Sequence, residues 1–211
     1  MLDPICTRYD GFYLVPLPFS SEMVRANCDG LKTATRRPAG SAILRNAQEA
    51  LKQRLNVVGW VREAWQATYA TEHGTSGDYF DLTKQERDRS TISAVRYRAD
   101  EELRGAANSI RWVPAMHMPF ERNRLFMRIT AIDLVRLGDI SEQDAVDEGV
   151  SACIGRVSVG FHPSAVSLFQ SIWSASYGVW NADQMVYRIS YERPIAGPVS
   201  SYIEVYQEIA A

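Results

Sequence analysis

The stretch Asn123–Leu137, "NRLFMRITAIDLVRL", constrains the fold more than any other part of the chain. Leu125, Met127, Ile129 and Ala131 alternate there with the residues between them. Side chains of a β-strand point alternately to its two faces, so this alternation predicts a long strand. We therefore expect a sheet in which this strand is a principal member.

Other stretches carry the signals of further strands and of helices. Ile43, Ala47 and Leu51 recur at the spacing of a helix that buries one face, and Ser141 with Asp144 forms a capping box. Helices are predicted over residues 20–30, 41–55, 139–150 and 163–177. Strands are predicted over residues 9–18, 31–38 and 183–194, and residues 56–65 are predicted to begin as a strand and pass into an irregular segment. This order predicts a mixed α+β domain around a small antiparallel sheet, which the pattern allows to be open or rolled into a barrel.

A polar and charged segment interrupts this pattern. Residues from about 66 to 110 include "TEHGTSGDYFDLTKQERDRS", and residues 74–78 have the composition of a loop. We interpret the segment as a partly helical insertion within one domain that spans residues 1–211. Residues 194–211 form a C-terminal extension, whose last stretch has the pattern of either a strand or a short helix.

Composition narrows the classes of function. The 23 basic and 25 acidic side chains give a formal net charge of −2. Non-specific nucleic-acid binding depends on Lys and Arg that neutralise phosphates, so a general coat protein for nucleic acid is disfavoured. No apolar run approaches the roughly 20 residues of a membrane helix, and the N-terminus lacks a secretory signal. We expect a cytoplasmic protein without a membrane partner.

The cysteines and histidines indicate no metal chemistry. There are three of each, widely spaced, without a CxxC or HxxxH arrangement. Such spacing is atypical of a disulfide framework or a zinc site. We predict no metal and no organic cofactor.

Several blocks of the sequence, taken in order, resemble the ASCH domain (activating signal cointegrator homology), especially the versions encoded by phages and prophages. The blocks are "MVRANCDGLKTATRRP", "WVREAW", "YRADE" with "RWVPAMHMP", "LGDISEQDAVDEGV" and "LFQSIWSASYGVWNADQMVYRISYER". The resemblance covers most of residues 18–193 and leaves out residues 66–95 and the C-terminal tail. It implies a PUA-like fold, in which helices flank a small β-barrel with a cleft beside it.

The resemblance also implies an activity. The family is thought to bind RNA or nucleotides, and one bacterial branch hydrolyses N4-acetylcytidine to cytidine and acetate. That branch uses a lysine, a threonine three residues later, and a glutamate after an acidic helix. The matching residues are Lys32, Thr35 and Glu148, so we expect an amidohydrolase that removes an acyl group from N4 of a cytosine nucleoside or related modified base.

These residue types fit the chemistry. A threonine hydroxyl is a weak nucleophile until a base removes its proton, and a lysine acts as that base only when its pKa is depressed. We expect Thr35 as nucleophile, Lys32 as base and Glu148 as proton shuttle, with an activated water as the alternative nucleophile. In an ideal strand residues 32 and 35 face opposite sides, so their convergence requires a bend at Gly30.

Other residues are candidates for substrate binding. Trp60 offers a ring for base stacking, and Glu63 an acceptor for a cytosine amino group. The same residues are also typical of a core tryptophan and a structural acid. Arg36, Arg37 and Arg124 are the remaining candidates, although positively charged side chains at a strand are commonly a solvated surface.

An alternative function is a non-catalytic module that binds single-stranded RNA or modified DNA for a phage. Arg36, Arg37, Arg122 and Arg124 would then form a phosphate-binding rim. Two departures from the family pattern bear on this. The chain has "NVVGWVRE" where relatives often have "GDRLWVRE", and "HMPFERNR" where they often have "HMPRWASR". Glu121 in place of arginine makes the cleft less attractive to phosphate.

Overall fold

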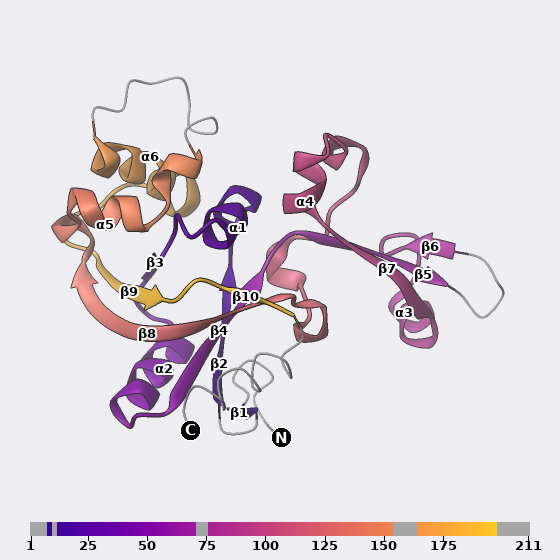
Figure 1. Cartoon of the computed structure of the whole chain (residues 1–211), viewed down its shortest axis with the longest axis horizontal. Helices are drawn as coiled ribbons and strands as arrows, with labels where there is room; N and C mark the ends of the chain where they lie inside the picture. Colours follow the sequence, from indigo (N-terminus) through magenta and orange to yellow (C-terminus); the bar gives the residue numbers. More distant parts are fainter. Residues whose placement is uncertain (1–7, 10–11, 71–75, 154–163, 198–211) are drawn as a thin grey trace. The chain divides into compact units, whose positions relative to one another are not determined.

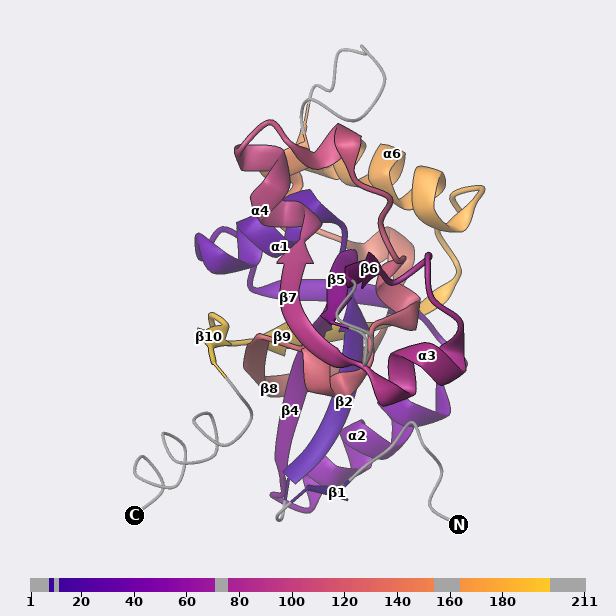
Figure 2. The same cartoon turned by 90° about the vertical axis from the view of Figure 1, so that its right-hand side faces the viewer.

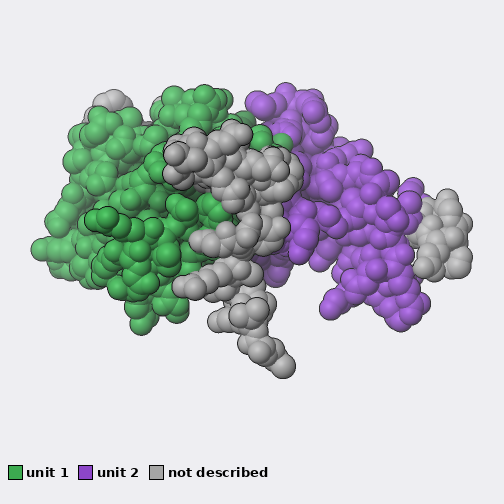
Figure 3. Space-filling model, turned by 60° about the horizontal axis from the view of Figure 1, so that its bottom comes forward, with its two compact units in different colours: residues 1–17, 25–61, 124–211 green, residues 18–24, 62–123 purple. Residues whose placement is uncertain are grey.

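The computed structural model describes residues 8–9, 12–70, 76–153 and 164–197 (Figures 1 and 2). The chain divides into two compact units, coloured separately in Figure 3. Unit 1 comprises residues 1–17, 25–61 and 124–211, and unit 2 comprises residues 18–24 and 62–123. Part of the predicted loop, residues 74–75, and residues 198–211 of the C-terminal extension lie outside the described residues.

The main sheet is antiparallel at every described register, as the sequence predicts. The chain also contains helices, so the predicted mixed α+β class is confirmed. Its strand order is β1-β2-β4-β8-β9-β3, with β10 paired to β8. The strands are β1 (Arg8–Tyr9), β2 (Phe12–Pro18), β3 (Ala34–Pro38), β4 (Asn56–Arg62), β8 (Leu125–Arg136), β9 (Met185–Tyr191) and β10 (Ile195–Ala196).

The long strand β8 organises this sheet, which confirms the strand predicted over Asn123–Leu137. Its first half pairs with β4 through Phe126–Arg128, and its second half pairs with β9 through Ile129–Arg136. The two halves of β8 therefore pair with different strands, and Figure 1 shows that β8 curves along its length. Among the described strands no closed barrel is found, because the order starts at β1 and ends at β3 without a pairing that joins them.

In the described residues, α-helices occur close to each of the four places where the sequence predicts them. They are α1 (Ser21–Cys28), α2 (Ala42–Lys52), α5 (Glu142–Asp147) and α6 (Ala165–Tyr177). The predicted capping box of α5 is confirmed, because the Ser141 hydroxyl accepts from the Asp144 amide and the Asp144 carboxylate accepts from the Ser141 amide. Such a cap satisfies two amides at the helix start, which lack partners within the helix.

An apolar cluster holds α5 and α6 against the β8–β9 end of the sheet. Its buried members are Leu137, Ile140, Ala145, Val150, Leu168, Phe169, Trp173 and Val186. Burying a side chain such as Leu or Phe contributes about 1.5–3 kcal/mol relative to leaving it exposed. Figure 1 shows α5 and α6 together near β3, β8 and β9. This packing fixes the acidic end of α5 beside β3.

Unit 2 contains a second sheet that the sequence did not predict. Its strands β5 (Trp65–Ala70), β6 (Ser76–Asp78) and β7 (Thr91–Tyr97) have the order β6-β5-β7. The helices α3 (Lys84–Arg89) and α4 (Arg98–Leu103) match the predicted partly helical character, and Figure 2 shows them at opposite ends of β7. The sheet encloses a small core of Trp65, Ala67, Tyr69, Val113 and Met118. In the described residues no helix is both long and apolar enough to cross a membrane.

Candidate active site

The exit from α1 places Lys32 beside the end of α5. Gly30 has a φ of +74°, which favours glycine, and the Lys32 amide donates to the Ala26 carbonyl at 3.2 Å. One residue later, the Thr33 amide donates to the Asp147 carbonyl at 2.9 Å. The expected bend at Gly30 is therefore present. Because β3 begins only at Ala34, Lys32 precedes the strand and the alternation of strand faces does not apply to it.

The structure brings Lys32 and Glu148 together in a buried ion pair. Lys32 is 2% exposed, and its Nζ lies 3.0 Å from Glu148 Oε2. The same Nζ donates to the carbonyl oxygens of Ala34 and Glu148, at 2.7 Å each. An ammonium group has three hydrogens, so each can be directed at one acceptor. The resting site is therefore a lysine held in one orientation by a carboxylate from a distant part of the chain.

Gly149 makes room for this lysine. The residue has a φ of +72°, and a Cβ atom added to it would lie 2.8 Å from the Cβ of Lys32. Real Cβ atoms essentially never approach that closely. The glycine after Glu148 is thus required both by its backbone conformation and by the close approach of Lys32.

Burial shifts the pKa values of Lys32 and of the nearby Tyr191. Desolvation lowers the pKa of Lys32, an effect that the Glu148 carboxylate opposes and the Arg37 charge reinforces. Nearby, the Tyr191 hydroxyl donates to Asn27 Oδ1 at 2.9 Å, and its oxygen lies 3.4 Å from the Ala34 carbonyl oxygen. Burial, together with the Glu148 charge, raises the pKa of Tyr191 well above 10.0, so this hydroxyl stays protonated at neutral pH.

Thr35 is buried on β3, but the structure does not join it to the ion pair. It is 3% exposed and pairs in register with Ile189 of β9. Neighbouring residues of a strand face opposite sides, and Arg36 faces Glu148, so Thr35 lies on the face shared with Ile189. Within the described part of the chain no hydrogen bond links the Thr35 hydroxyl to Lys32 or Glu148. Two of the three predicted catalytic residues are thus brought together.

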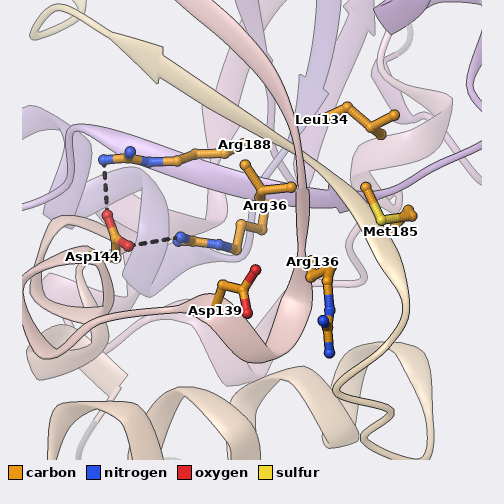
Figure 4. A pocket seen from close by; sticks show the side chains of 8 residues that line it. Arg36, Leu134, Arg136, Asp139, Asp144, Met185 and Arg188 are labelled. Atoms are coloured by element: carbon orange, nitrogen blue, oxygen red, sulfur yellow. Dashed lines mark ion pairs between the residues drawn. The ribbon is translucent and has the colours of Figure 1, made fainter.

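Arg36 extends the ion pair into a larger network. Its NH1 donates to Glu148 Oε1 at 3.3 Å, and its NH2 lies 3.1 Å from Asp144 Oδ2. The other Asp144 oxygen lies 2.8 Å from an NH2 nitrogen of Arg188, and Figure 4 shows both arginines directed at this carboxylate. Arg36 also lies over the Phe169 ring, with its guanidinium carbon 5.9 Å from the ring centroid.

A pocket of about 360 Å³ opens beside this network. It is lined by Arg36, Leu134, Val135, Arg136, Asp139, Asp144, Met185 and Arg188 (Figure 4). Sequence reasoning recognised Asp144 only as a cap of α5 and missed Arg188. The register of β3 with β9 places Arg188 directly opposite Arg36 and therefore on the same face. That register is set by the fold and is not visible in the sequence.

The other predicted binding residues lie in different places. In unit 1, Arg37 NH1 donates to the Tyr177 hydroxyl at 2.7 Å, and the Arg124 carbonyl accepts from the Gly197 amide at 3.0 Å. Trp60 is half-buried on β4, opposite Phe126 of β8. Glu63 belongs to unit 2, where it is 1% exposed in the two-residue link between β4 and β5.

Among the described residues no group of three His, Cys, Asp or Glu side chains is arranged to hold a metal ion. Comparison with known protein families, with curated proteins and with solved structures finds no match to this chain. The resemblance to the ASCH domain therefore stays a prediction from the motif blocks. What the geometry offers chemically is a buried amine and carboxylate that can exchange a proton.

Proposed function

We propose that the protein is an amidohydrolase of the ASCH type, with a PUA-like fold, that removes an acyl group from N4 of a cytosine nucleoside or related modified base. The observation that carries the proposal is the contact of 3.0 Å between Lys32 Nζ and Glu148 Oε2 in a buried site. Burial favours the neutral amine, and a neutral amine is what a general base requires.

In the proposed reaction the pair first redistributes its own proton. Transfer from Lys32 to Glu148 leaves a neutral amine beside a carboxylic acid. The amine then takes the proton of a hydroxyl whose oxygen attacks the acyl carbon. The bond between that carbon and N4 breaks, and Glu148 gives its proton to the departing amine. Base and acid are thus adjacent and coupled, which suits a reaction that needs both.

The attacking hydroxyl belongs to Thr35 or to water. Attack by Thr35 forms an ester of the threonine, which a water molecule then hydrolyses to regenerate the hydroxyl and release the carboxylic acid. Attack by water gives the same products in one displacement. The position of Thr35 on the face away from Arg36 favours the water route, while the resemblance to the ASCH branch that uses a threonine three residues after the lysine favours the ester route.

Substrate binding is proposed for the residues near the pair. Arg37 acts electrostatically on Lys32 and contacts Tyr177 of α6, whose side chain is partly exposed. An aromatic ring next to a guanidinium suits a planar base. Trp60, Arg124 and Glu63 remain candidates on the sequence alone.

The alternative, a module that binds single-stranded RNA or modified DNA, requires arginines that are available to phosphate. Arg36 is 4% exposed and is held by the carboxylates of Glu148 and Asp144. The other three arginines of the predicted rim belong to different units, Arg37 and Arg124 to unit 1 and Arg122 to unit 2. Binding of oligonucleotides that weakens with salt, and that is lost when these three become alanine, would support the alternative.

The direct test is hydrolysis of N4-acetylcytidine and its deoxy analogue, followed by chromatography of the cytidine released. We expect turnover by the native protein and a loss of at least about 100-fold in Lys32→Met and in Glu148→Gln, because each removes one proton-transfer group. Lys52→Met is the matched control, since Lys52 has a side chain that is 64% exposed. The absence of turnover by folded native protein, or full activity of Lys32→Met, would contradict the proposal.

A further inference from the structure

Five charged side chains form a row that leads from the buried ion pair to the pocket. We name this row, Lys32–Glu148–Arg36–Asp144–Arg188, the charge ladder. The signs alternate along it, and each contact between neighbours is between 2.8 and 3.3 Å. Lys32 and Arg36 have almost fully buried side chains, whereas the Arg188 side chain is 32% exposed. One end of the ladder is thus shielded from water and the other is open to the pocket.

Arg36 binds the carboxylate oxygen of Glu148 that Lys32 does not contact. Lys32 occupies Oε2, and Arg36 occupies Oε1. A carboxylate held from both oxygens by charged donors is fixed in rotation, because such charge-assisted hydrogen bonds are stronger than neutral ones. Asp144 holds the second terminal nitrogen of Arg36 at 3.1 Å, so it fixes the guanidinium from the opposite side.

We propose that Arg36 and Asp144 are positioning residues that hold the Glu148 carboxylate and set how readily Lys32 gives up its proton. Neither residue needs to touch the substrate, because each acts through Glu148. As far as it concerns turnover, this inference rests on the proposed function. As far as it concerns the proton on Lys32, it stands on the geometry alone.

Other charged or titratable groups also face the ion pair. The effect of Arg36 and Asp144 on the titration of Lys32 must be larger than theirs. They come from β3, β9 and the short helix Val150–Cys153, and they are Arg37, Tyr191 and Cys153. The proposal therefore predicts that the Lys32 titration midpoint moves in opposite directions when the two charges are removed. Loss of the Arg36 charge should raise the midpoint, because a nearby positive charge is gone. Loss of the Asp144 charge should lower it, because the Arg36 charge is then no longer balanced.

The composition of the chain makes this measurable, because it has only three lysines, Lys32, Lys52 and Lys84. Protein labelled with ¹³C-lysine gives three Cε signals, whose pH titrations are followed by NMR. We expect the Lys32 midpoint to rise by about one pH unit in Arg36→Met and to fall by about half a unit in Asp144→Asn. Arg36→Lys restores the charge, adds a fourth Cε signal, and should return the Lys32 midpoint most of the way. Lys52 and Lys84 report any change that is not local.

Asp139→Asn is the matched control, because it removes an exposed carboxylate that lines the same pocket but lies outside the ladder. It should leave the Lys32 midpoint where it is. Equal midpoints in the native protein, Arg36→Met and Asp144→Asn would overturn the proposal, as would shifts of the same sign. If Arg36→Met does not fold, the comparison of Arg36→Lys, Asp144→Asn and Asp139→Asn still decides it, because a midpoint unmoved by Asp144→Asn contradicts the proposal.

The same variants separate this inference from the proposed function. In a protein that hydrolyses N4-acetylcytidine, the limb of the pH–rate profile that follows Lys32 should move to higher pH in Arg36→Met and to lower pH in Asp144→Asn. If the native protein turns over no substrate but the NMR signs appear, the proposed function fails and the ladder stands. If turnover is found but the limb and the midpoints do not move, the ladder fails and the proposed function stands.

Discussion

The backbone of Gly149 lies so close to Lys32 that a Cβ atom there would stand 2.8 Å from the lysine Cβ. Gly149 directly follows Glu148, the ion-pair partner of the same lysine. The chain therefore places a residue without a side chain at the one position where Lys32 passes the end of α5. This close approach is what lets the amine reach the carbonyl and the carboxylate of Glu148 together.

Substitution of Gly149 tests the close approach. Gly149→Ala has to adopt a φ of +72° and displace Lys32, so we expect a loss of about 2–3 kcal/mol in the free energy of unfolding and the loss of any turnover. Gly30→Ala is the control, because its φ is +74° but its nearest contact would be an ordinary 3.8 Å. It should cost about 1 kcal/mol, from the backbone alone. Urea unfolding measures both; equal losses would show that Lys32 does not press on Gly149.

The ion pair itself should be strongly coupled. Because removing one partner leaves the other charge buried, Lys32→Met should lower the unfolding free energy by about 3 kcal/mol or more. Glu148→Gln in the same chain removes the stranded charge, so the double variant should be less destabilised than the sum of the single ones. A double-mutant cycle from urea unfolding gives this coupling energy. Strictly additive losses would mean that the two side chains act independently.

Asp144 should make stability depend on acid pH. Burial alone would raise the pKa of Asp144, but hydrogen bonds from Ser141 and the charges of Arg36 and Arg188 outweigh it and hold the pKa below 3.8. The unfolded chain therefore binds more protons near pH 3.8, and the stabilisation from Asp144 is present above that value and lost as the pH falls through the lower one. We expect the stability gap between native protein and Asp144→Asn to shrink below about pH 4. A gap that stays constant down to pH 2 would contradict this.

Variants at Thr35 decide between the two attacking groups. If Thr35 forms an ester, Thr35→Val should lose at least about 100-fold in turnover, and Thr35→Ser should retain part of it. Mass spectrometry of the native protein, quenched during turnover, should then find the acyl group on Thr35. If water attacks, Thr35→Val should stay within about tenfold of the native rate and no acyl-protein should form.

Many helices and strands of the fold were predictable, because they depend on signals that are local in the sequence. The strand β8, the helix α2 and the capping box at Ser141 depend on signals within a few residues, and each element appears where it was predicted. The buried stripe of α2 is shifted, because Leu44, Ala47 and Ala50 are buried while Ile43 and Leu51 are half-buried. The pairing of Lys32 with Glu148 was anticipated only through the family resemblance. These residues are 116 positions apart, and no periodicity connects them.

Other features were not predictable from local signals. The sheet of unit 2 was missed because β7 exposes Thr91, Ser93, Ala94 and Arg96, which breaks the strict alternation of a half-buried strand. A shift of register between Thr68 and Tyr69 disturbs the pattern of β5 in the same way. The roles of Asp144 and Arg188 depend on the register between β3 and β9, which only the folded chain sets.

The most direct test of the account is the titration of Lys32 in the native protein, read from the three ¹³Cε lysine signals. Burial makes the Lys32 amine easier to deprotonate, so its midpoint should lie below the ordinary lysine value of 10.5. A Lys32 signal that titrates at or above 10.5 would contradict the central claim.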